Sequence, residues 1–332
     1  MGNNLDIAAL AAAVGRGDRR ALARAVTLVE STRPEHRALA EALLAALPAK
    51  RTASIRLGIT GAPGVGKSTF IEAFGRHLTS LGRRVAVLAV DPSSSRTGGS
   101  ILGDKTRMPL LSRDPNAFIR PTPAGSSQGG VARRTREAMM LVEAAGYDIT
   151  IVETVGVGQS EYAVADMVDM FLLLLAPGGG DELQGIKRGI MELADLLVVN
   201  KADGALIGAA NNAASDYRNA LNLIRPKTVA WRAQVLLASA LLGEGLAEIW
   251  QAVQKFQTAL TADGSKQAGR DAQARRWLWE EIQDDLMAEL KSDPALSPLI
   301  AARLEQVGRG DITPSAGARD ILAAFLRRAD KS

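Results

Sequence analysis

Short apolar segments alternate with longer amphipathic segments between about residue 54 and residue 262. The apolar segments are 55–60, 85–90, 149–152, 171–175, 196–199 and 235–238. Helical periodicity predicts helices between and after them, over 67–81, 130–146, 181–194, 204–223 and 245–260. Strands with little polar alternation are buried on both faces, which is typical of a parallel sheet covered by helices. We therefore expect an α/β domain with a doubly wound, mainly parallel sheet over residues 54–262.

Helical segments flank this predicted domain on both sides. Residues 1–53 predict two or three helices that carry no chemistry of their own. Residues 263–332 predict a helical arm, in which Trp279, Ile282 and Leu286 recur at spacings of three and four. Leu290 extends this apolar stripe, which suits either packing against the α/β core or a subunit interface. The large side chains of Trp277 and Trp279 lead us to expect a homodimer.

The composition excludes several classes of function. The 332 residues contain no cysteine and only two histidines, so disulfides, thiolate chemistry and multi-histidine metal sites are excluded. His36 and His77 stand alone in predicted helices. The formal net charge of +4 is spread without a block of like charge, so we expect no nucleic-acid partner. The apolar runs are too short to span a bilayer and no secretory signal is evident, so we expect a cytoplasmic protein without a membrane partner.

A phosphate-binding loop follows the first predicted strand. It matches the Walker A pattern with Gly61, Ala62, Pro63, Gly64, Val65, Gly66, Lys67, Ser68 and Thr69. Glycines let the loop curl so that its backbone N–H groups face the β-phosphate, beside the positive end of a helix. Lys67 is expected to reach the β- and γ-phosphate oxygens, and Ser68 to ligate Mg²⁺. The second lysine of deviant Walker A ATPases is missing, because position 62 is Ala.

An N-K-x-D motif after the strand 196–199 predicts guanine as the base. Its carboxylate, Asp203, can accept from both N1–H and the 2-amino group of guanine, whereas adenine offers no donor at either position. Leaving such a carboxylate unmatched can discriminate between ligands by roughly 10⁴-fold. Asn200 is expected to tie this base loop to the phosphate-binding loop, and Lys201 to cover one face of the ring. Ser239-Ala240 follows the last strand like the loop that reads guanine O6 through backbone N–H groups.

The strand 149–152 leads into Glu153-Thr154-Val155-Gly156, where Ras-like GTPases carry D-x-x-G. The Glu153 side chain is expected to hold Mg²⁺ through water, and the Gly156 N–H to meet the γ-phosphate. Val157 stands where Ras-like proteins carry a glutamine that orients water, and it has no group for this task. Gln159 is the candidate replacement. We therefore expect slow intrinsic hydrolysis that a partner accelerates.

Two further segments carry polar residues to the carboxyl edge of the predicted sheet. Asp91 ends the strand 85–90 and is a candidate for holding Mg²⁺ water or positioning the nucleophile, although an Asp before Pro also caps turns. Asp104 either joins the metal shell or simply starts a helix. A glycine-rich segment follows the strand 171–175 and predicts a third nucleotide-sensing segment, with a plain loop as the alternative. Its polar residues are Asp181, Glu182, Gln184 and Lys187.

These motifs together resemble the MeaB/ArgK family of P-loop GTPases. The most specific segments are ETVGVGQ and PGGGDELQGIK, at 153–159 and 177–187, and the resemblance covers nearly the whole chain. It implies a GTPase fold of the SIMIBI type and a chaperone of adenosylcobalamin-dependent methylmalonyl-CoA mutase, which gates cofactor loading and protects the enzyme. It also implies homodimerisation through the C-terminal arm.

The same resemblance assigns roles to individual residues. GTP or GDP would be held by the phosphate-binding loop, by Asp203 and by 239–241, which ends at Leu241. Residues 177–188 would form the switch III segment. The residues around Mg²⁺ would be Ser68, Asp91, Asp104 and Glu153. The catalytic set would be Lys67, Asp91, Glu153 and Gln159.

Three other functions remain as alternatives. A nickel-delivering metallochaperone GTPase usually carries cysteines or a histidine-rich tract, which this chain lacks. A small-molecule kinase usually uses adenine and needs a pocket for the phosphate acceptor. A non-hydrolysing interaction module would leave GTP intact. The sequence contains no D-x-H-x-x-G cobalamin motif, so an effect on that cofactor would act through the partner.

Overall fold

The computed structural model describes residues 6–48, 54–90, 108–122, 128–154, 160–178 and 188–329. The chain forms two compact units, 1–273 and 274–332. The division falls inside a helix, whereas the sequence predicts a boundary at residue 263. The N-terminal helices belong to the first unit together with the α/β fold.

The described part of the first unit contains a seven-stranded sheet in which every pairing is parallel. The strands are β1 (Ile55–Gly61), β2 (Val85–Val90), β3 (Ala117–Thr122), β4 (Ile149–Thr154), β5 (Met170–Leu175), β6 (Leu196–Val199) and β7 (Gln234–Leu237). Their spatial order is β3-β2-β4-β1-β5-β6-β7. The doubly wound parallel sheet expected from the sequence is therefore confirmed.

The sequence prediction missed one strand, β3. Its apolar part is only Ala117 to Ile119, and Arg120 and Pro121 then interrupt the pattern. Proline is tolerated in an edge strand, because one side of the strand needs no ladder hydrogen bond. β3 lies at the edge of the sheet and pairs with β2 alone. Arg120 forms an ion pair with the buried Glu30 of the N-terminal helices, so its charge is neutralised.

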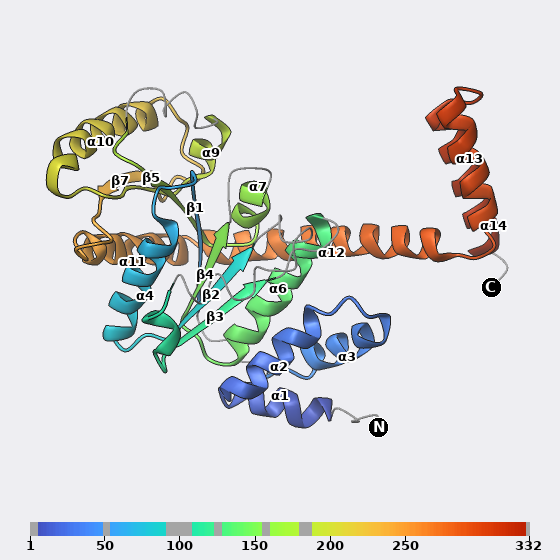
Figure 1. The fold of residues 1–332 in the computed structure, drawn as a ribbon, viewed down its shortest axis with the longest axis horizontal. Helices are drawn as coiled ribbons and strands as arrows, with labels where there is room; N and C mark the ends of the chain where they lie inside the picture. The colour runs from blue at the N-terminus through green and yellow to red at the C-terminus, as the bar shows by residue number, and fades with distance from the viewer. Residues whose placement is uncertain are drawn as a thin grey trace. The chain divides into compact units, whose positions relative to one another are not determined.

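Helices cover both faces of this sheet, as Figure 1 shows. The helices in the described part of the first unit are α1 (Ile7–Gly15), α2 (Arg19–Val29), α3 (Pro34–Ala45), α4 (Lys67–Ser80), α6 (Gln128–Ala144), α7 (Ser160–Ala165), α9 (Arg188–Leu193), α10 (Ile207–Asn222), α11 (Leu246–Ala262) and the start of α12 (Ser265–Ser292), with 3₁₀ turns η2 (Leu111–Arg113) and η3 (Gly204–Leu206). Helices α4 and α11 pack together, and α6 contacts both the sheet and α7. The three N-terminal helices contact α6. None of the helices described here is long and apolar enough to cross a membrane.

The main core fills the space between the sheet and α4 with α11. Phe70 and Phe74 of α4 stack with ring centroids 5.6 Å apart. They belong to the same buried cluster as Leu57 and Ile59 of β1 and Trp250 of α11. β1 is therefore held rigidly between its neighbours, which fixes the position of the loop that follows it.

The second unit consists of the rest of α12, α13 (Ser297–Arg309) and α14 (Pro314–Ala329). Arg303 of α13 pairs with Asp320 of α14 at 2.8 Å. Several large apolar side chains of this unit are exposed, namely Leu278, Trp279, Ile282, Leu286, Met287, Leu304, Leu322 and Leu326. Of the stripe predicted on α12, Trp279, Ile282 and Leu286 are therefore exposed, and Leu290 is half-buried.

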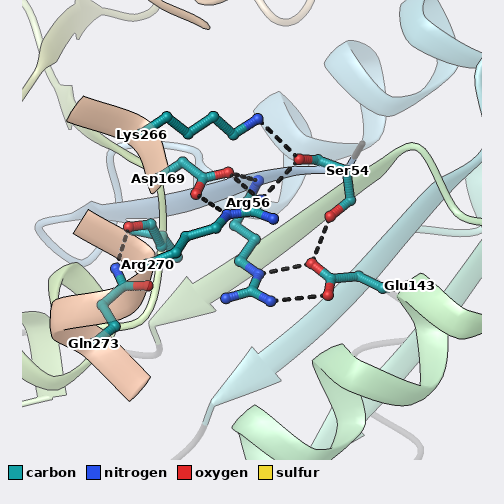
Figure 2. Close-up of polar contacts among 8 residues, drawn as sticks. Ser54, Arg56, Glu143, Asp169, Lys266, Arg270 and Gln273 are labelled. Carbon is teal, nitrogen blue, oxygen red and sulfur yellow. Dashed lines mark hydrogen bonds and ion pairs between the residues drawn. The ribbon is translucent and has the colours of Figure 1, made fainter. Parts of the chain in front are cut away.

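A buried ionic cluster lies where β1 begins (Figure 2). The Arg56 guanidinium donates to both carboxylate oxygens of Glu143, at 2.7 and 2.8 Å. The Ser54 hydroxyl donates to the same carboxylate at 2.5 Å. Burial opposes ionisation of Glu143, but the hydrogen bonds and charge of Arg56 outweigh it, so the pKa of Glu143 lies below its ordinary value.

The first turns of α12 are bound to the same place. Arg270 donates to both carboxylate oxygens of Asp169, at 2.8 and 2.7 Å, and to the backbone oxygen of Ser54 at 2.8 Å. Asp169 also accepts from the backbone N–H of Arg56 at 2.9 Å. Lys266 reaches the Ser54 oxygen at 3.3 Å (Figure 2). The base of α12 is therefore fixed to the beginning of β1 by charged groups.

Replacement of Glu143 by alanine is expected to lower the free energy of unfolding by about 3–5 kcal/mol, because it leaves the Arg56 charge buried without its partner. A group with a depressed native pKa stabilises the fold above its ordinary pKa, and this contribution is lost as the pH falls through the native pKa. The wild type should therefore lose more stability on acidification than Glu143→Ala. Urea unfolding followed by circular dichroism at neutral and acidic pH measures both effects.

The matched control is Arg37→Ala, which removes the partner of Glu41 in an exposed pair on α3. Pairs of this kind contribute about 0.3–0.5 kcal/mol. If the two variants were equally stable, the assignment of Glu143 as a buried ionic anchor would be wrong.

Candidate nucleotide-binding site

The predicted nucleotide-binding residues lie where β1, β4, β6 and β7 end. Because all strands run parallel, these ends meet at one edge of the sheet. β1 is central, with β4 on one side and β5 on the other, so chain connections leave it in both directions. Ligands of doubly wound sheets bind in the crevice at such a switch point.

The phosphate-binding loop joins the end of β1 to the start of α4. Helix α4 begins at Lys67, and its N-cap residue Gly66 provides no side-chain hydrogen bond. The first N–H groups of a helix lack intrahelical partners, so they are available to phosphate oxygens. The Lys67 ammonium lies over the loop and donates to the backbone oxygens of Gly61 and Ala62, at 2.7 and 3.2 Å. The loop therefore places an ammonium group and a helix start at the same point.

Two of the loop glycines are required by close backbone approach. Gly66 has a φ of 91°, and a Cβ atom there would lie 2.9 Å from the Asn200 amide nitrogen. A Cβ atom at Gly61 would lie 2.5 Å from the backbone oxygen of Leu174 on β5. The glycines of the motif thus let the loop pack against β5 and against the base loop.

The base loop is tied to the phosphate-binding loop. Asn200, 1% exposed, donates from its amide nitrogen to the backbone oxygen of Val65 at 3.0 Å. Its amide oxygen accepts from the N–H of Ala240 at 3.1 Å. Lys201 has a positive φ of 59° and donates to the Gly64 oxygen at 2.7 Å. The contact between the two loops that the sequence predicts for Asn200 is therefore confirmed, and the same residue also holds the loop after β7.

The Asp203 carboxylate accepts a hydrogen bond from the Ser239 hydroxyl. That hydroxyl accepts in turn from the N–H of Leu242 at 3.1 Å, so the turn after β7 orients it. The sequence points to the backbone of 239–241 and gives no sign of this side-chain contact. A carboxylate bound through one oxygen keeps further acceptor positions, which suit N1–H and the 2-amino group of guanine. Leu241 is exposed beside this turn.

Two of the predicted metal ligands come together beside the loop. The Ser68 hydroxyl of α4 donates to Glu153 at the end of β4, at 3.4 Å, and Glu153 is 4% exposed. A hydroxyl and a carboxylate are hard oxygen ligands of the kind that Mg²⁺ prefers, so this pair fits that ion. The buried Thr154 and Thr60 hydroxyls bond at 2.7 Å and hold the ends of β4 and β1 together.

The remaining predicted site residues lie outside the described residues. They are Asp91, Asp104, Gly156, Gln159, Asp181, Glu182, Gln184 and Lys187. Helices α7 and α9, which follow segment 153–159 and the glycine-rich segment 177–187 in the sequence, contact each other. A Cβ atom at Gly189 of α9 would lie only 2.3 Å from the Tyr162 hydroxyl of α7, so the two helices meet at this glycine. The structure therefore places the elements after both segments side by side.

Comparison with known families decides between the GTPase classes. Residues 22–295 match the family described as "Methylmalonyl Co-A mutase-associated GTPase MeaB". The chain belongs to the MeaB family. The matched range covers the phosphate-binding loop, the base loop and all of α12, so the resemblance predicted from the sequence motifs is confirmed.

Relatives that match almost the whole of this chain support the membership. A putative GTPase from Caulobacter vibrioides is 55% identical over 97% of this chain and 98% of its own length. The mitochondrial methylmalonic aciduria type A homolog of Mus musculus is 49% identical over 94% of this chain and 78% of its own length. The crystal structure of a LAO/AO transport system kinase is 41% identical, with a TM-score of 0.76 over 98% of this chain and 99% of that one.

As a member of the MeaB family, the chain is a P-loop GTPase and binds guanine nucleotide.

Proposed function

We propose that this MeaB-family GTPase is a G-protein chaperone of adenosylcobalamin-dependent methylmalonyl-CoA mutase, in which GTP binding and hydrolysis gate cofactor loading and protect or reactivate the enzyme. The observation that carries the proposal is the match of residues 22–295 to a family described as mutase-associated. The long match to a methylmalonic aciduria type A homolog supports it. A cytoplasmic location stays a prediction from the sequence.

The chain's own residues suggest how the site acts on GTP. The Lys67 ammonium, which donates to backbone oxygens of its own loop, would move from these to the β- and γ-phosphates. Asp203 would hold the base. Ser68 and Glu153 would hold Mg²⁺, which supplies charge neutralisation of the phosphates when bound. Asp91 and Asp104 are proposed to complete the metal shell, and 177–188 to relay the nucleotide state to the mutase.

The hydrolytic step is proposed to depend on the partner. Val157 offers no group that orients an attacking water, and Gln159 is the candidate substitute within the chain. A slow intrinsic rate allows the bound nucleotide to act as a timer until the mutase docks.

A pull-down with adenosylcobalamin-dependent methylmalonyl-CoA mutase tests the proposal. We expect retention of the mutase to differ between GDP and a non-hydrolysable GTP analogue, because a ligand shifts an equilibrium only through differential affinity. We also expect single-turnover GTP hydrolysis to accelerate when the mutase is added. The control is a cobalamin-independent CoA enzyme. Equal retention in both nucleotide states, together with an unchanged rate, would contradict the chaperone function.

A small-molecule kinase is the second candidate, because one similar structure is a LAO/AO transport system kinase. The Asp203 carboxylate argues against it, since adenine has no donors for that group. Competition between ATP and GTP separates the two functions. The metallochaperone alternative lacks support in the described residues, where His36 lies on α3, His77 on α4, and no group of three or more His, Cys, Asp or Glu side chains could hold a metal ion.

The homodimer is proposed to form through the exposed apolar side chains of the second unit. Trp279 and Leu286 on α12 are 65% and 54% exposed. Replacing both by lysine should weaken self-association by about 10³-fold, since interface hot spots contribute at least about 2 kcal/mol each and the two together about 4 kcal/mol. Analytical ultracentrifugation measures the change.

Leu223→Lys is the control for the dimer experiment, because this exposed leucine lies in the first unit at the end of α10. It should leave self-association unchanged. A wild-type chain that sediments as a monomer, or a double lysine variant that dimerises normally, would contradict the proposed interface.

A further inference from the structure

A cavity of about 270 Å³ lies in the first unit, away from the nucleotide-binding residues. Its lining includes Asp169 and Asp195, which directly precede β5 and β6. The phosphate-binding loop instead follows the end of β1. In a parallel sheet the two ends of the strands lie at opposite edges, so the cavity and the nucleotide-binding residues are at opposite edges of the sheet. The function proposed above does not use this cavity.

One wall of the cavity is apolar and rigid. Trp231 and Phe256 pack edge to face, with ring centroids 5.3 Å apart, and Leu260 lies beside them in the lining. The Trp231 indole N–H donates to the backbone oxygen of Asp195 at 2.9 Å, which fixes the ring. Such a wall suits the apolar body of a small molecule.

The charged groups around the cavity favour an anion. The lining contains five cationic side chains, from Arg225, Lys227, Arg232, Lys266 and Arg270, and three carboxylates, from Asp169, Glu192 and Asp195. Two of the cations are neutralised locally, because Arg270 pairs with Asp169 at 2.7 Å and Lys227 pairs with Asp195 at 2.9 Å. Among the other charged side chains of the lining, the three cations of Arg225, Arg232 and Lys266 outnumber the one carboxylate of Glu192. Burial lowers the pKa of Lys266, and an anion in the cavity would oppose that effect.

Two polar atoms of the lining have no hydrogen-bond partner. Gln273, which is 7% exposed, donates from its amide nitrogen to the backbone oxygen of Val168 at 2.9 Å, but its amide oxygen is buried and unpartnered (Figure 2). The Thr228 hydroxyl is also buried without a partner. Buried polar groups are nearly always bonded, so these two call for a ligand or a water. The amide oxygen needs a donor, and the hydroxyl can donate to an anion.

A helical glycine leaves room at the cavity. Gly269 lies in α12 and lines the cavity, and a Cβ atom there would meet nothing within 4 Å. Glycine inside a helix is unfavourable relative to alanine, and packing at this position does not require it. A larger side chain at this exposed position of the lining would therefore meet open space at the mouth of the cavity.

We propose that this cavity binds a small organic carboxylate that combines an apolar body with an N–H or O–H donor. The carboxylate would face Arg225, Arg232 and Lys266, and the apolar body would lie on the Trp231 wall. The donor would bond to the Gln273 amide oxygen. The volume restricts the ligand to a small molecule, since pockets for drug-sized ligands are about 300–1,000 Å³.

N-acetyl-L-leucine has all three features and serves as the probe, with calorimetry on the full chain saturated with GDP so that the nucleotide site is filled. We expect saturable binding. The neutral N-acetyl-L-leucinamide should bind about tenfold or more weakly, because it lacks the charge-assisted hydrogen bonds. 4-Methylpentanoate, which keeps the carboxylate but lacks the N–H donor, should bind several-fold more weakly than the probe.

Gly269→Leu is designed to fill the cavity while favouring the helix, so it should abolish probe binding and keep GTP turnover. Arg232→Gln should weaken the probe about tenfold, whereas Arg24→Gln, on the exposed side of α2, is the matched control and should not. If Gly269→Leu fails to fold, Thr228→Val, which replaces the hydroxyl by a methyl group of similar size, should still weaken binding. Absence of saturable probe binding to the wild type, or unchanged binding to the folded cavity variants, would overturn the proposal.

Discussion

The Asp203→Asn protein is expected to bind xanthosine triphosphate in preference to GTP. Xanthine keeps the N1–H of guanine but carries an oxygen in place of the 2-amino group. An asparagine amide can accept from N1–H and donate to that oxygen, whereas it cannot accept both guanine donors as a carboxylate does. We expect GTP affinity to fall by about 10²- to 10⁴-fold, because each hydrogen bond to a charged group contributes about 1.5–3 kcal/mol.

Calorimetric titration of GTP, xanthosine triphosphate and ATP measures this change. Asparagine can still accept from the Ser239 hydroxyl, so the turn after β7 should keep its place. Asp216→Asn, on the exposed side of α10, is the control and should leave all three affinities unchanged. If Asp203→Asn kept the wild-type choice of purine, the assignment of the base loop would be wrong.

Lys67→Ala is expected to reduce GTP hydrolysis by about 10²- to 10³-fold at saturating nucleotide, because it removes a preorganised positive charge from the β- and γ-phosphates. The Lys67 ammonium already lies against the backbone of its own loop, so it needs only a short rearrangement to reach phosphate. The fold should be preserved, because Lys67 lies at the start of α4 and outside the main core.

Single-turnover assays with saturating GTP separate this chemical effect from weaker binding. Lys255→Ala, which removes an exposed lysine of α11, is the control and should hydrolyse GTP at the wild-type rate. Turnover of Lys67→Ala close to that of the wild type would show that the ammonium does not contribute to the reaction.

Six strands were predictable from the sequence because each contains a run of mainly apolar residues, and burial on both faces of the inner strands removes polar alternation. β7, which is only partly buried at the other edge, still carries such a run in residues 235–237. β3 was not predictable in this way. At the edge of the sheet it tolerates Arg120 and Pro121, and the ion pair between Arg120 and Glu30 forms only after α2 has packed nearby. The signal for β3 is therefore a tertiary contact rather than a local pattern.

The phosphate-binding loop and the N-K-x-D motif were predictable for a different reason. Each is a continuous segment whose residue types are dictated by one ligand, so the chemistry can be read at fixed spacing. The contact between Asp203 and Ser239 could not be read in this way, since the two residues are 36 positions apart and serine is common in turns. Segments 153–159 and 177–187 likewise indicated the family from the sequence alone, and the family match over residues 22–295 confirms it.

The sequence by itself determined the parallel α/β architecture, the phosphate-binding loop and the choice of guanine, because buried strands and ligand-contacting loops leave local patterns. Only the tertiary structure decided which ionic contacts hold the beginning of β1 to its neighbours. Arg56 and Glu143 are 87 positions apart, and each alone resembles an ordinary surface residue. The cavity lined by parts of α9, α10, α11 and the start of α12 is also a tertiary feature. Its lining comes from separate elements whose side chains share no periodicity, so only folding brings their charges together.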